Sequence, residues 1–510
     1  MSLVLTARRR LAHVDPLVPA LCALATVLYV LHGFDGYLSR DLGDYAYGGQ
    51  QVAEGVPPYV AVVNRAGPLA HLIPGVGAVL AQWVGADQVV GMRVFLMLFA
   101  IASIGVLYVL ARDLFRSRLA GVAAAAMLLG CQGFIAYASD GPREKTSMVL
   151  FLLCAMLATV HRRWLTAGFF IALSTLCWQP VFFVAMAGTV TAIVLGQSTG
   201  RLRAVVRVLV GGAIPSAVTV GAYAAVGALG IFMDDFVLIN ARYTQQTSLI
   251  TNPWAALSML ASGYGPSLAF FLIGLVAITV LWVRALRRPK DQRDAQWVDL
   301  MAVGALLVAG FVWSLKAFNG FPDAFIMLPP AALGIGGLVV VLAERVPLRK
   351  VVIATAVWTV ATTAVGATYA ISTRNHALDD QRASVQAVMD VLPSDARILS
   401  VEAPQPLVLT HQRNLSRYQQ FGNGLLEYVD DTWPGGSEGY GRWVGRRHPT
   451  LIALGNGGVV PSWLAPTLDG GYQRVGTTIG WDWYASKDVG PQTLQTLQKV
   501  VKDTYIPEVP

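Results

Sequence analysis

The chain has 510 residues, of which 55% are hydrophobic and 13% are charged, and its formal net charge is +8. Soluble domains have roughly a quarter of their residues charged, so this composition excludes an ordinary soluble protein and predicts an α-helical polytopic membrane protein. Lys and Arg collect in the cytoplasmic loops of such proteins, and we therefore expect no nucleic-acid partner. The four cysteines lie in apolar runs without metal-ligand spacing, which predicts neither disulfide bonds nor a zinc site.

Residues 16–31 form the first apolar segment and follow an arginine run at residues 8–10. No cleavage site is evident before Asp41, so we expect an uncleaved helix with a cytoplasmic N-terminus. The next region, residues 34–88, then lies on the outer face of the membrane. Within it, residues 69–84 are apolar but interrupted by a Pro-Gly pair and shorter than the roughly 20 residues of a typical span, which predicts a helix lying at the outer interface.

Further apolar segments follow at intervals expected of spanning helices, at residues 89–110, 119–137, 146–160, 165–178, 181–195, 208–229, 266–283, 298–315, 324–342 and 351–371. Together with the first segment they predict about eleven transmembrane helices in a domain covering residues 1–371. Every strongly basic connection then falls on the side of the N-terminus, as the positive-inside rule requires. Adding or removing one span would invert half of the loops.

After residue 371 the charge becomes nearly balanced and no segment is long and apolar enough to span a membrane. Helix-like patterns at residues 378–391 and 439–446 alternate with strand-like patterns at residues 397–401 and 450–454. Residues 372–510 are therefore expected to form an extracytoplasmic soluble α/β domain. The abundance of Ala, Val, Gly and Arg favours a bacterial protein, located in the plasma membrane.

Ionisable residues gather in two of the predicted outer loops: Asp41, Asp44, Glu54, Arg65, Asp140, Arg143, Glu144 and Lys145. Such clusters beside a membrane often mark substrate paths. Sugar transfer from a phosphate-activated donor needs a carboxylate that takes the acceptor proton, and cations or a metal ion that stabilise the leaving phosphate. The alternative interpretation is structural, because loop aspartates often serve as turn residues or helix caps and basic side chains often extend to lipid headgroups.

Three short motifs carry a resemblance to a known family: Asp41-x-x-x-Tyr45-Ala46-Tyr47, Glu54-Gly55-x-Pro57-Pro58-Tyr59, and Arg65-Ala66-Gly67-Pro68. In this order, after the first helix of a many-spanning protein, they resemble the first outer loop of the GT-C superfamily of glycosyltransferases. The branch they resemble most is that of the dolichyl-phosphate-mannose protein mannosyltransferases and bacterial aminoarabinose transferases. The resemblance covers residues 15–200 well, extends in part to residue 345, and does not reach the C-terminal domain.

The resemblance implies site residues. Asp41 would be the catalytic base or the ligand of a divalent cation, Mg or Mn, and Arg65 would contact the donor phosphate. Asp140 would correspond to a second acid, and Gln179-Pro180 is similar to a Lys-Gln-Pro motif of the family. The sequence also departs from the family: Leu42 replaces a glutamate, so either Asp44 supplies the second carboxylate or the metal site is absent.

Two more departures concern the phosphate contacts. Trp178 stands in place of a lysine, and Asp323-Ala324 stands in place of a His-Tyr pair, next to the motif-like stretch at residues 319–322. The candidate phosphate-binding residues are therefore Arg65, Arg143, Lys145 and Gln179. Aromatic faces on which an acceptor sugar stacks are expected at Tyr45, Tyr59 and Trp433, although such residues more often belong to a core.

These observations predict a glycosyltransferase that moves a sugar, mannose or arabinose, from a polyprenyl-phosphate donor to a cell-envelope glycan, glycolipid or protein, with inversion. No nucleotide-binding phosphate loop is evident in the sequence. The alternative is a transporter or flippase of a lipid-linked precursor, which predicts charged residues in the middle of spans and two similar halves with broken helices; neither is evident. A noncatalytic assembly scaffold predicts that Asp41→Ala leaves function intact.

Overall fold

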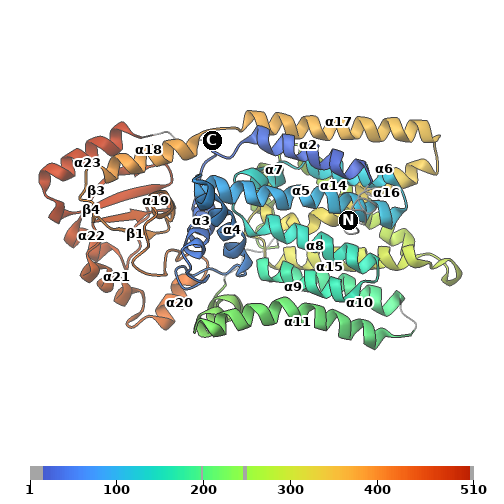
Figure 1. The fold of residues 1–510 in the computed structure, drawn as a ribbon, viewed down its shortest axis with the longest axis horizontal. Helices are drawn as coiled ribbons and strands as arrows, with labels where there is room; N and C mark the ends of the chain where they lie inside the picture. The colour runs from blue at the N-terminus through green and yellow to red at the C-terminus, as the bar shows by residue number, and fades with distance from the viewer. Residues whose placement is uncertain (1–14, 197–198, 245–249, 506–510) are drawn as a thin grey trace, which may run out of the picture.

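The structure is a computed structural model that describes residues 15–196, 199–244 and 250–505, so the arginine run at residues 8–10 lies outside the described residues. Figure 1 shows two parts in contact: a bundle of long helices and, at one end of it, a smaller domain that contains a β-sheet. Helices α3 (Arg40–Ala53) and α4 (Leu69–Val84) lie between the two parts.

All of the predicted spanning segments are helical: α2 (Leu17–His32), α5 (Gln88–Phe115), α6 (Arg118–Leu129) with α7 (Gln132–Ser139), α8 (Glu144–Val160), α9 (Trp164–Cys177), α10 (Val181–Gly196), α11 (Arg201–Ala225), α14 (Ser267–Leu286), α15 (Ala295–Lys316), η3 (Phe321–Met327) with α16 (Leu328–Ala343), and α17 (Leu348–Ser372). By length and apolar composition, six helices of the described residues can cross a membrane, or seven if α6 and α7, which bend by 68°, form one span. The chain is thus a multi-pass membrane protein, and the number eleven stays a prediction.

Small residues allow some of these helices to pack closely. On α9, a Cβ atom added to Gly168 would lie 2.0 Å from the carbonyl oxygen of Val208 on α11, and one added to Gly211 of α11 would lie 2.0 Å from the carbonyl oxygen of Leu165. Close backbone approach of this kind is a common way for helices to associate in a membrane, where burial of apolar surface provides little driving force.

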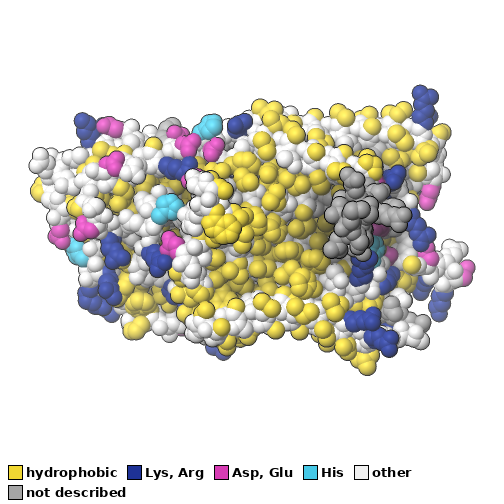
Figure 2. Space-filling view, viewed as in Figure 1, with side chains coloured by type: hydrophobic (Ala, Val, Ile, Leu, Met, Phe, Trp, Pro, Cys, Tyr) yellow, Lys and Arg dark blue, Asp and Glu magenta, His cyan; other side chains and the backbone are white. Residues whose placement is uncertain are grey.

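The surface of the bundle carries a broad apolar belt. Figure 2 shows this belt in yellow between the C-terminal domain and the opposite end of the bundle, where Lys and Arg side chains gather. Figure 1 shows α11 and α17 along opposite margins of the bundle. In each of these two spans, only 22% of an apolar stretch of 18 residues is buried inside the protein. An apolar belt bounded by charged ends is what a bilayer requires of a protein that spans it.

The predicted outer loop at residues 34–88 contains helix α3, which the sequence does not predict as a helix over most of its length. Helix α3 begins after Ser39, whose hydroxyl accepts a hydrogen bond from the backbone N–H of Leu42 at 3.4 Å. Serine is among the preferred residues at this capping position. The apolar stretch that follows forms α4, with Pro74 inside the helix.

The connection between the predicted spans at residues 208–229 and 266–283 is also partly helical in its described residues. It contains α12 (Leu229–Met233) and a π-helix, η1 (Asp234–Tyr243), and is followed by α13 (Pro253–Tyr264). π-helical turns are rare and occur frequently at functional sites.

The C-terminal domain has a four-stranded mixed sheet in the order β1-β2-β4-β3, in which β1 and β2 are parallel and the other pairs are antiparallel. The strands are β1 (Ile398–Val401), β2 (Leu451–Leu454), β3 (Tyr472–Thr478) and β4 (Trp481–Ser486). The helices are α18 (Ala377–Met389), α19 (Gln405–Thr410), α20 (Leu425–Thr432), α21 (Gly436–Arg447), α22 (Ala465–Gly471) and α23 (Pro491–Asp503). Short 3-10 turns are η2 (Lys290–Gln292) in the bundle, and η4 (Asn456–Gly458) and η5 (Lys487–Val489) in this domain.

One apolar core joins the C-terminal domain to the membrane part. Leu38 and Ala46, from the start and the middle of the α3 region, are fully buried in the same cluster as Leu407 of α19 and Trp483 of β4. The domain is therefore seated on α3 by a continuous hydrophobic interface, which fixes its position over the end of the bundle.

Candidate active site

A large cavity lies where the end of the bundle, α3 and the C-terminal domain meet. Its empty volume is about 2040 Å³, including the open solvent at its mouth. Its walls come from α3, the segment of residues 64–66, the starts of α8 and α10, η1, the end of α15, and residues 420–425 of the C-terminal domain. Most of the ionisable residues predicted from the outer loops face this space.

Helix α3 presents Asp41, Asp44 and Tyr45 to the cavity. Asp44 and Tyr45 follow Asp41 by three and four positions, so each of them lies beside Asp41 on the helix surface. The two carboxylates nevertheless have different surroundings, and this difference decides what each can do.

The carboxylate of Asp41 is held by two arginines. One oxygen accepts hydrogen bonds from Arg40 at 3.2 and 3.3 Å, and the other accepts from Nη1 of Arg143 at 2.7 Å. Burial alone would raise the pKa of Asp41, but the guanidinium groups of Arg143 and Arg40 outweigh it and hold the pKa well below its usual value. Asp41 is thus an ionised anchor for two cations and a weak base.

The carboxylate of Asp44 is deeply buried, with 1% of the residue exposed. Its Oδ2 accepts a hydrogen bond from the side-chain amide of Asn64, whereas Oδ1 has no hydrogen-bond partner among the described residues. Burial raises the pKa of Asp44 to about 7, and the hydrogen bond from Asn64 limits the rise. A carboxylate with a free oxygen and a pKa near the working pH has the properties of a general base.

Arg65 presents a guanidinium group to the same cavity. Its Nη1 donates to the carbonyl oxygen of Asn423 at 3.1 Å, and no carboxylate of the described residues lies within ion-pair distance of it. The backbone carbonyl of Arg65 accepts hydrogen bonds from Gln179 and Asn240, each at 2.9 Å. Gln179, which the sequence predicts to bind phosphate, lines the cavity. Its side-chain amide donates a hydrogen bond to the backbone carbonyl of Arg65 and so holds this peptide in place.

Lys145 and Arg143 are more engaged than Arg65. The ammonium group of Lys145 lies 2.5 Å from Asp323 and 3.3 Å from Glu144, and stands 4.7 Å from the centre of the Trp178 ring. Arg143 binds Asp41 and lies over the ring of Tyr45 at 5.7 Å. Both cations line the cavity, and their role as phosphate ligands stays a prediction.

Asp140, Tyr59 and Trp433 are not among the residues that line the cavity. Asp140 lies 3.8 Å from the buried His32, next to the backbone of Gly36. Tyr59 is fully buried and its hydroxyl donates to the carbonyl oxygen of Ala66 at 2.7 Å. Trp433 packs in an aromatic cluster of the C-terminal domain, and in these positions all three side chains have structural contacts.

The residues around Asp41 do not fit a resident divalent cation. Both of its oxygens are engaged by guanidinium groups, and the described residues contain no group of three or more His, Cys, Asp or Glu side chains placed to hold one ion. Ca²⁺ and Mg²⁺ are bound through carboxylate oxygens, with waters or phosphate oxygens completing the coordination, and neither oxygen of Asp41 is left unpaired for such a bond. We therefore expect a chelator such as EDTA to leave the activity of the purified protein unchanged. A loss of activity that Mg²⁺ or Mn²⁺ restores would contradict this expectation.

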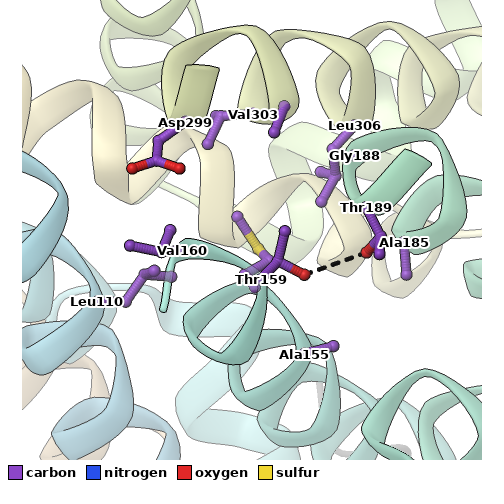
Figure 3. A pocket seen from close by; sticks show the side chains of 12 residues that line it. Leu110, Ala155, Thr159, Val160, Ala185, Gly188, Thr189, Asp299, Val303 and Leu306 are labelled. Atoms are coloured by element: carbon purple, nitrogen blue, oxygen red, sulfur yellow. Dashed lines mark hydrogen bonds between the residues drawn. The ribbon is translucent and has the colours of Figure 1, made fainter. Parts of the chain in front are cut away.

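A second cavity lies inside the bundle, away from the C-terminal domain, with an empty volume of about 380 Å³. Figure 3 shows its mainly apolar walls and the hydrogen bond between the hydroxyl groups of Thr159 and Thr189, 3.1 Å apart. Its one carboxylate among the described lining residues, Asp299, is paired with Arg162 at 2.6 Å. This cavity lacks an acid-base group free to react, and we place the candidate site in the larger one.

No protein-family model and no curated protein matches the sequence, but solved structures match the fold. The ArnT protein from Cupriavidus metallidurans, solved in the apo state and bound to undecaprenyl phosphate, is 13% identical with a TM-score of 0.61, over 96% of this chain and 99% of its own. The Archaeoglobus fulgidus oligosaccharyltransferase AglB, in complex with an inhibitory peptide and a dolichol-phosphate, is 12% identical with a TM-score of 0.53, over 95% of this chain and 77% of its own. Both are GT-C glycosyltransferases.

This chain has the GT-C fold. The resemblance inferred from the outer-loop motifs is thus confirmed at the level of the fold. Within the GT-C fold of this chain, the departures at Trp178 and Asp323 are neighbours in space, since both contact the ammonium group of Lys145. They form one local arrangement around a single lysine.

Sequence reasoning missed several residues of this candidate site. Asn64 holds Asp44, and Glu402 of the C-terminal domain accepts from Arg40 at 2.9 Å and from the backbone N–H of Phe421 and Gly422 at 2.5 and 3.0 Å. Asn64 adjoins a motif residue, which is a signal that pattern matching could have used. Glu402 carries no signal in its own segment, because its contacts reach back 362 positions along the chain.

Proposed function

We propose that this protein is a membrane glycosyltransferase that moves a sugar from a polyprenyl-phosphate donor to an acceptor hydroxyl. The observation that carries the proposal is the meeting of Asp44 and Arg65 in one cavity: a buried carboxylate with a free oxygen, and a guanidinium group without a carboxylate partner among the described residues. The fold agrees with this chemistry, since the similar ArnT and AglB structures contain undecaprenyl phosphate and dolichol-phosphate.

In the proposed reaction, Oδ1 of Asp44 takes the proton of the acceptor hydroxyl while the hydroxyl oxygen attacks the anomeric carbon of the sugar. The bond between that carbon and the phosphate oxygen breaks, and the electron pair stays on the phosphate. Attack from the face opposite the phosphate inverts the anomeric configuration. Arg65 stabilises the charge of the polyprenyl phosphate as it leaves, because fixed cations in a water-poor site act strongly on developing charge.

The proposed donor also needs a path for its lipid tail. Phe182 and Phe183, at the start of α10, line the cavity and are 42% and 64% exposed. Trp178 and Trp313 also line the cavity, and the Trp178 ring lies against the ammonium group of Lys145. A polyprenyl chain lying against these rings would bring its phosphate to Arg65 while its tail remains in the bilayer.

The test is a transfer assay with purified protein, radiolabelled polyprenyl-phosphate mannose or arabinose, and an extract of cell-envelope glycans, glycolipids and proteins as acceptor. We expect transfer of one of these sugars to an extracted acceptor and release of free polyprenyl phosphate. Absence of transfer from either donor would contradict the proposed donor sugars. Movement of the intact donor across a vesicle membrane without transfer would instead support a flippase.

Arg65→Ala is expected to weaken use of the donor. A hydrogen bond between charged groups contributes about 1.5–3 kcal/mol, so kcat/KM for the donor should fall by roughly 10- to 100-fold. The measurement is donor-dependent kinetics at saturating acceptor. Arg413→Ala is the matched control, because Arg413 is exposed, pairs with Glu54 and does not line the cavity. Equal kinetics for Arg65→Ala and the control would contradict the phosphate role of Arg65.

A further inference from the structure

The segment of residues 63–66 is held by hydrogen bonds to residues that are distant in the chain. The backbone N–H of Val63 donates to the carbonyl oxygen of Arg417 at 2.9 Å. Gln179 and Asn240 both donate to the carbonyl oxygen of Arg65 at 2.9 Å. This segment is therefore a rigid support, and the side chain it carries next to Asp44 is that of Asn64.

Asn64 has one geometry that satisfies its contacts. Its side-chain oxygen accepts from the backbone N–H of Ala66 at 2.7 Å, so its amide nitrogen must point the other way. That nitrogen donates to Oδ2 of Asp44. The hydrogen bond occupies one oxygen of the carboxylate, fixes its plane, and leaves Oδ1 free.

Asn64 is in turn fixed by an ion pair between two parts of the molecule. Its backbone N–H donates to Oδ2 of Asp235 at 3.3 Å, and the other oxygen of Asp235 is paired with the guanidinium group of Arg417. Asp235 belongs to the π-helix η1 and is 0% exposed, whereas Arg417 belongs to the C-terminal domain. A buried carboxylate of this kind holds its partners firmly, because an unpaired charge there would be costly.

We propose that Asn64 is the positioning residue of Asp44, and that Arg417 of the C-terminal domain fixes Asn64 through Asp235. This inference rests on the proposed function, in which Asp44 accepts the acceptor proton. It assigns the C-terminal domain a part in aligning the base, through Asp235 and Asn64, in addition to any contact with the acceptor.

The charged groups around Asp44 determine how this can be tested. Asp41 and Glu402 disfavour its ionised form, whereas Arg40, Arg65 and the hydrogen bond from Asn64 favour it. Burial and the two carboxylates raise the pKa of Asp44, and the hydrogen bond from Asn64 counteracts them. Removing that hydrogen bond should therefore raise the pKa of Asp44, so that the ionised base forms at higher pH. Burial also raises the pKa of Asp235 to about 7, so a variant must show which carboxyl controls the rate.

The experiment is the pH profile of kcat in the transfer assay for Asn64→Leu, with Asn64→Ser as a second variant too short to reach Asp44. We expect kcat to fall. We also expect the acid limb of the profile, which is the decrease of kcat at low pH, to move to higher pH by roughly one to two units, with the donor KM unchanged. Gln179→Leu is the matched control, since Gln179 holds the same segment without touching Asp44. It should lower the plateau without moving the limb.

Three further variants complete the test. Asp235→Asn should keep an acid limb if Asp44 controls the rate, and loss of the limb would overturn the inference. Arg417→Met should move the limb in the same direction as Asn64→Leu, and an unmoved limb would overturn the part assigned to Arg417. Full transfer by Asp44→Asn would overturn the proposed base itself. An inactive Asp44→Asn together with unmoved limbs in both Asn64 variants would overturn the positioning inference alone.

Discussion

Asp44→Asn is expected to lower the transfer rate by roughly 100- to 10,000-fold, the usual contribution of a general base. Asparagine has nearly the same shape but cannot take a proton, and the cavity wall should be preserved. The measurement is kcat at saturating donor and acceptor. In the wild-type protein the rate should rise as the pH increases through about 7, because burial raises the pKa of Asp44 to about 7 and only the ionised form accepts a proton.

Asp41→Asn is the comparison that separates the two aspartates. Asp41 holds Arg40 and Arg143, so its loss should mainly disturb these cations and raise the donor KM. We expect a smaller fall in kcat than for Asp44→Asn. If Asp41→Asn abolished kcat while Asp44→Asn remained active, the base would be Asp41, as the motif alone predicts.

Lys145→Met is expected to destabilise the protein by about 3–5 kcal/mol, the cost of leaving buried charges without their partner. Lys145, Glu144 and Asp323 have side-chain exposures of 5%, 3% and 9%, and the lysine is within ion-pair distance of both carboxylates. The measurement is unfolding of the detergent-solubilised protein by denaturant or heat. Lys145→Arg keeps the charge and should recover most of the loss.

Lys316→Met is the matched control for this prediction. Lys316 ends α15, is exposed, and contacts the Trp313 ring at 5.9 Å with no ion pair to a described carboxylate. Such a contact contributes only about 0.5–1 kcal/mol at an exposed site. If the Lys145→Met variant were as stable as the Lys316→Met control but had a raised donor KM, Lys145 would be a phosphate ligand, as predicted from the sequence.

The helices of the bundle and their order could be predicted from the sequence because apolar length alone determines a spanning segment. The helical and strand patterns at residues 378–391, 397–401, 439–446 and 450–454 also correspond to α18, β1, α21 and β2. The strands β3 and β4 were not predicted, because their alternation is weak and their pairing is fixed by contact with β2. Helix α3 was mostly missed since its glycines and tyrosines resemble a loop by propensity.

The candidate residues were predicted better than their roles. The sequence predicted Asp41, Asp44, Arg65, Arg143 and Lys145 in two outer loops, and all five line one cavity. The motif favoured Asp41 over Asp44 as the base, whereas we propose Asp44, because the choice depends on burial and on cations that come from other helices. Burial and neighbouring charges are established only when the chain folds. A sequence motif can therefore locate a carboxylate but cannot predict its pKa.

The apolar interface between α3 and the C-terminal domain has a consequence for synthesis of the protein. Leu38 and Ala46 are made early, yet the core that buries them includes Leu407 and Trp483. Domains usually fold in the order in which they are made, but the burial of Leu38 and Ala46 requires residues as late in the chain as Trp483. In a nascent chain, Leu38 and Ala46 are therefore expected to stay incompletely buried until the residues up to Trp483 have been made.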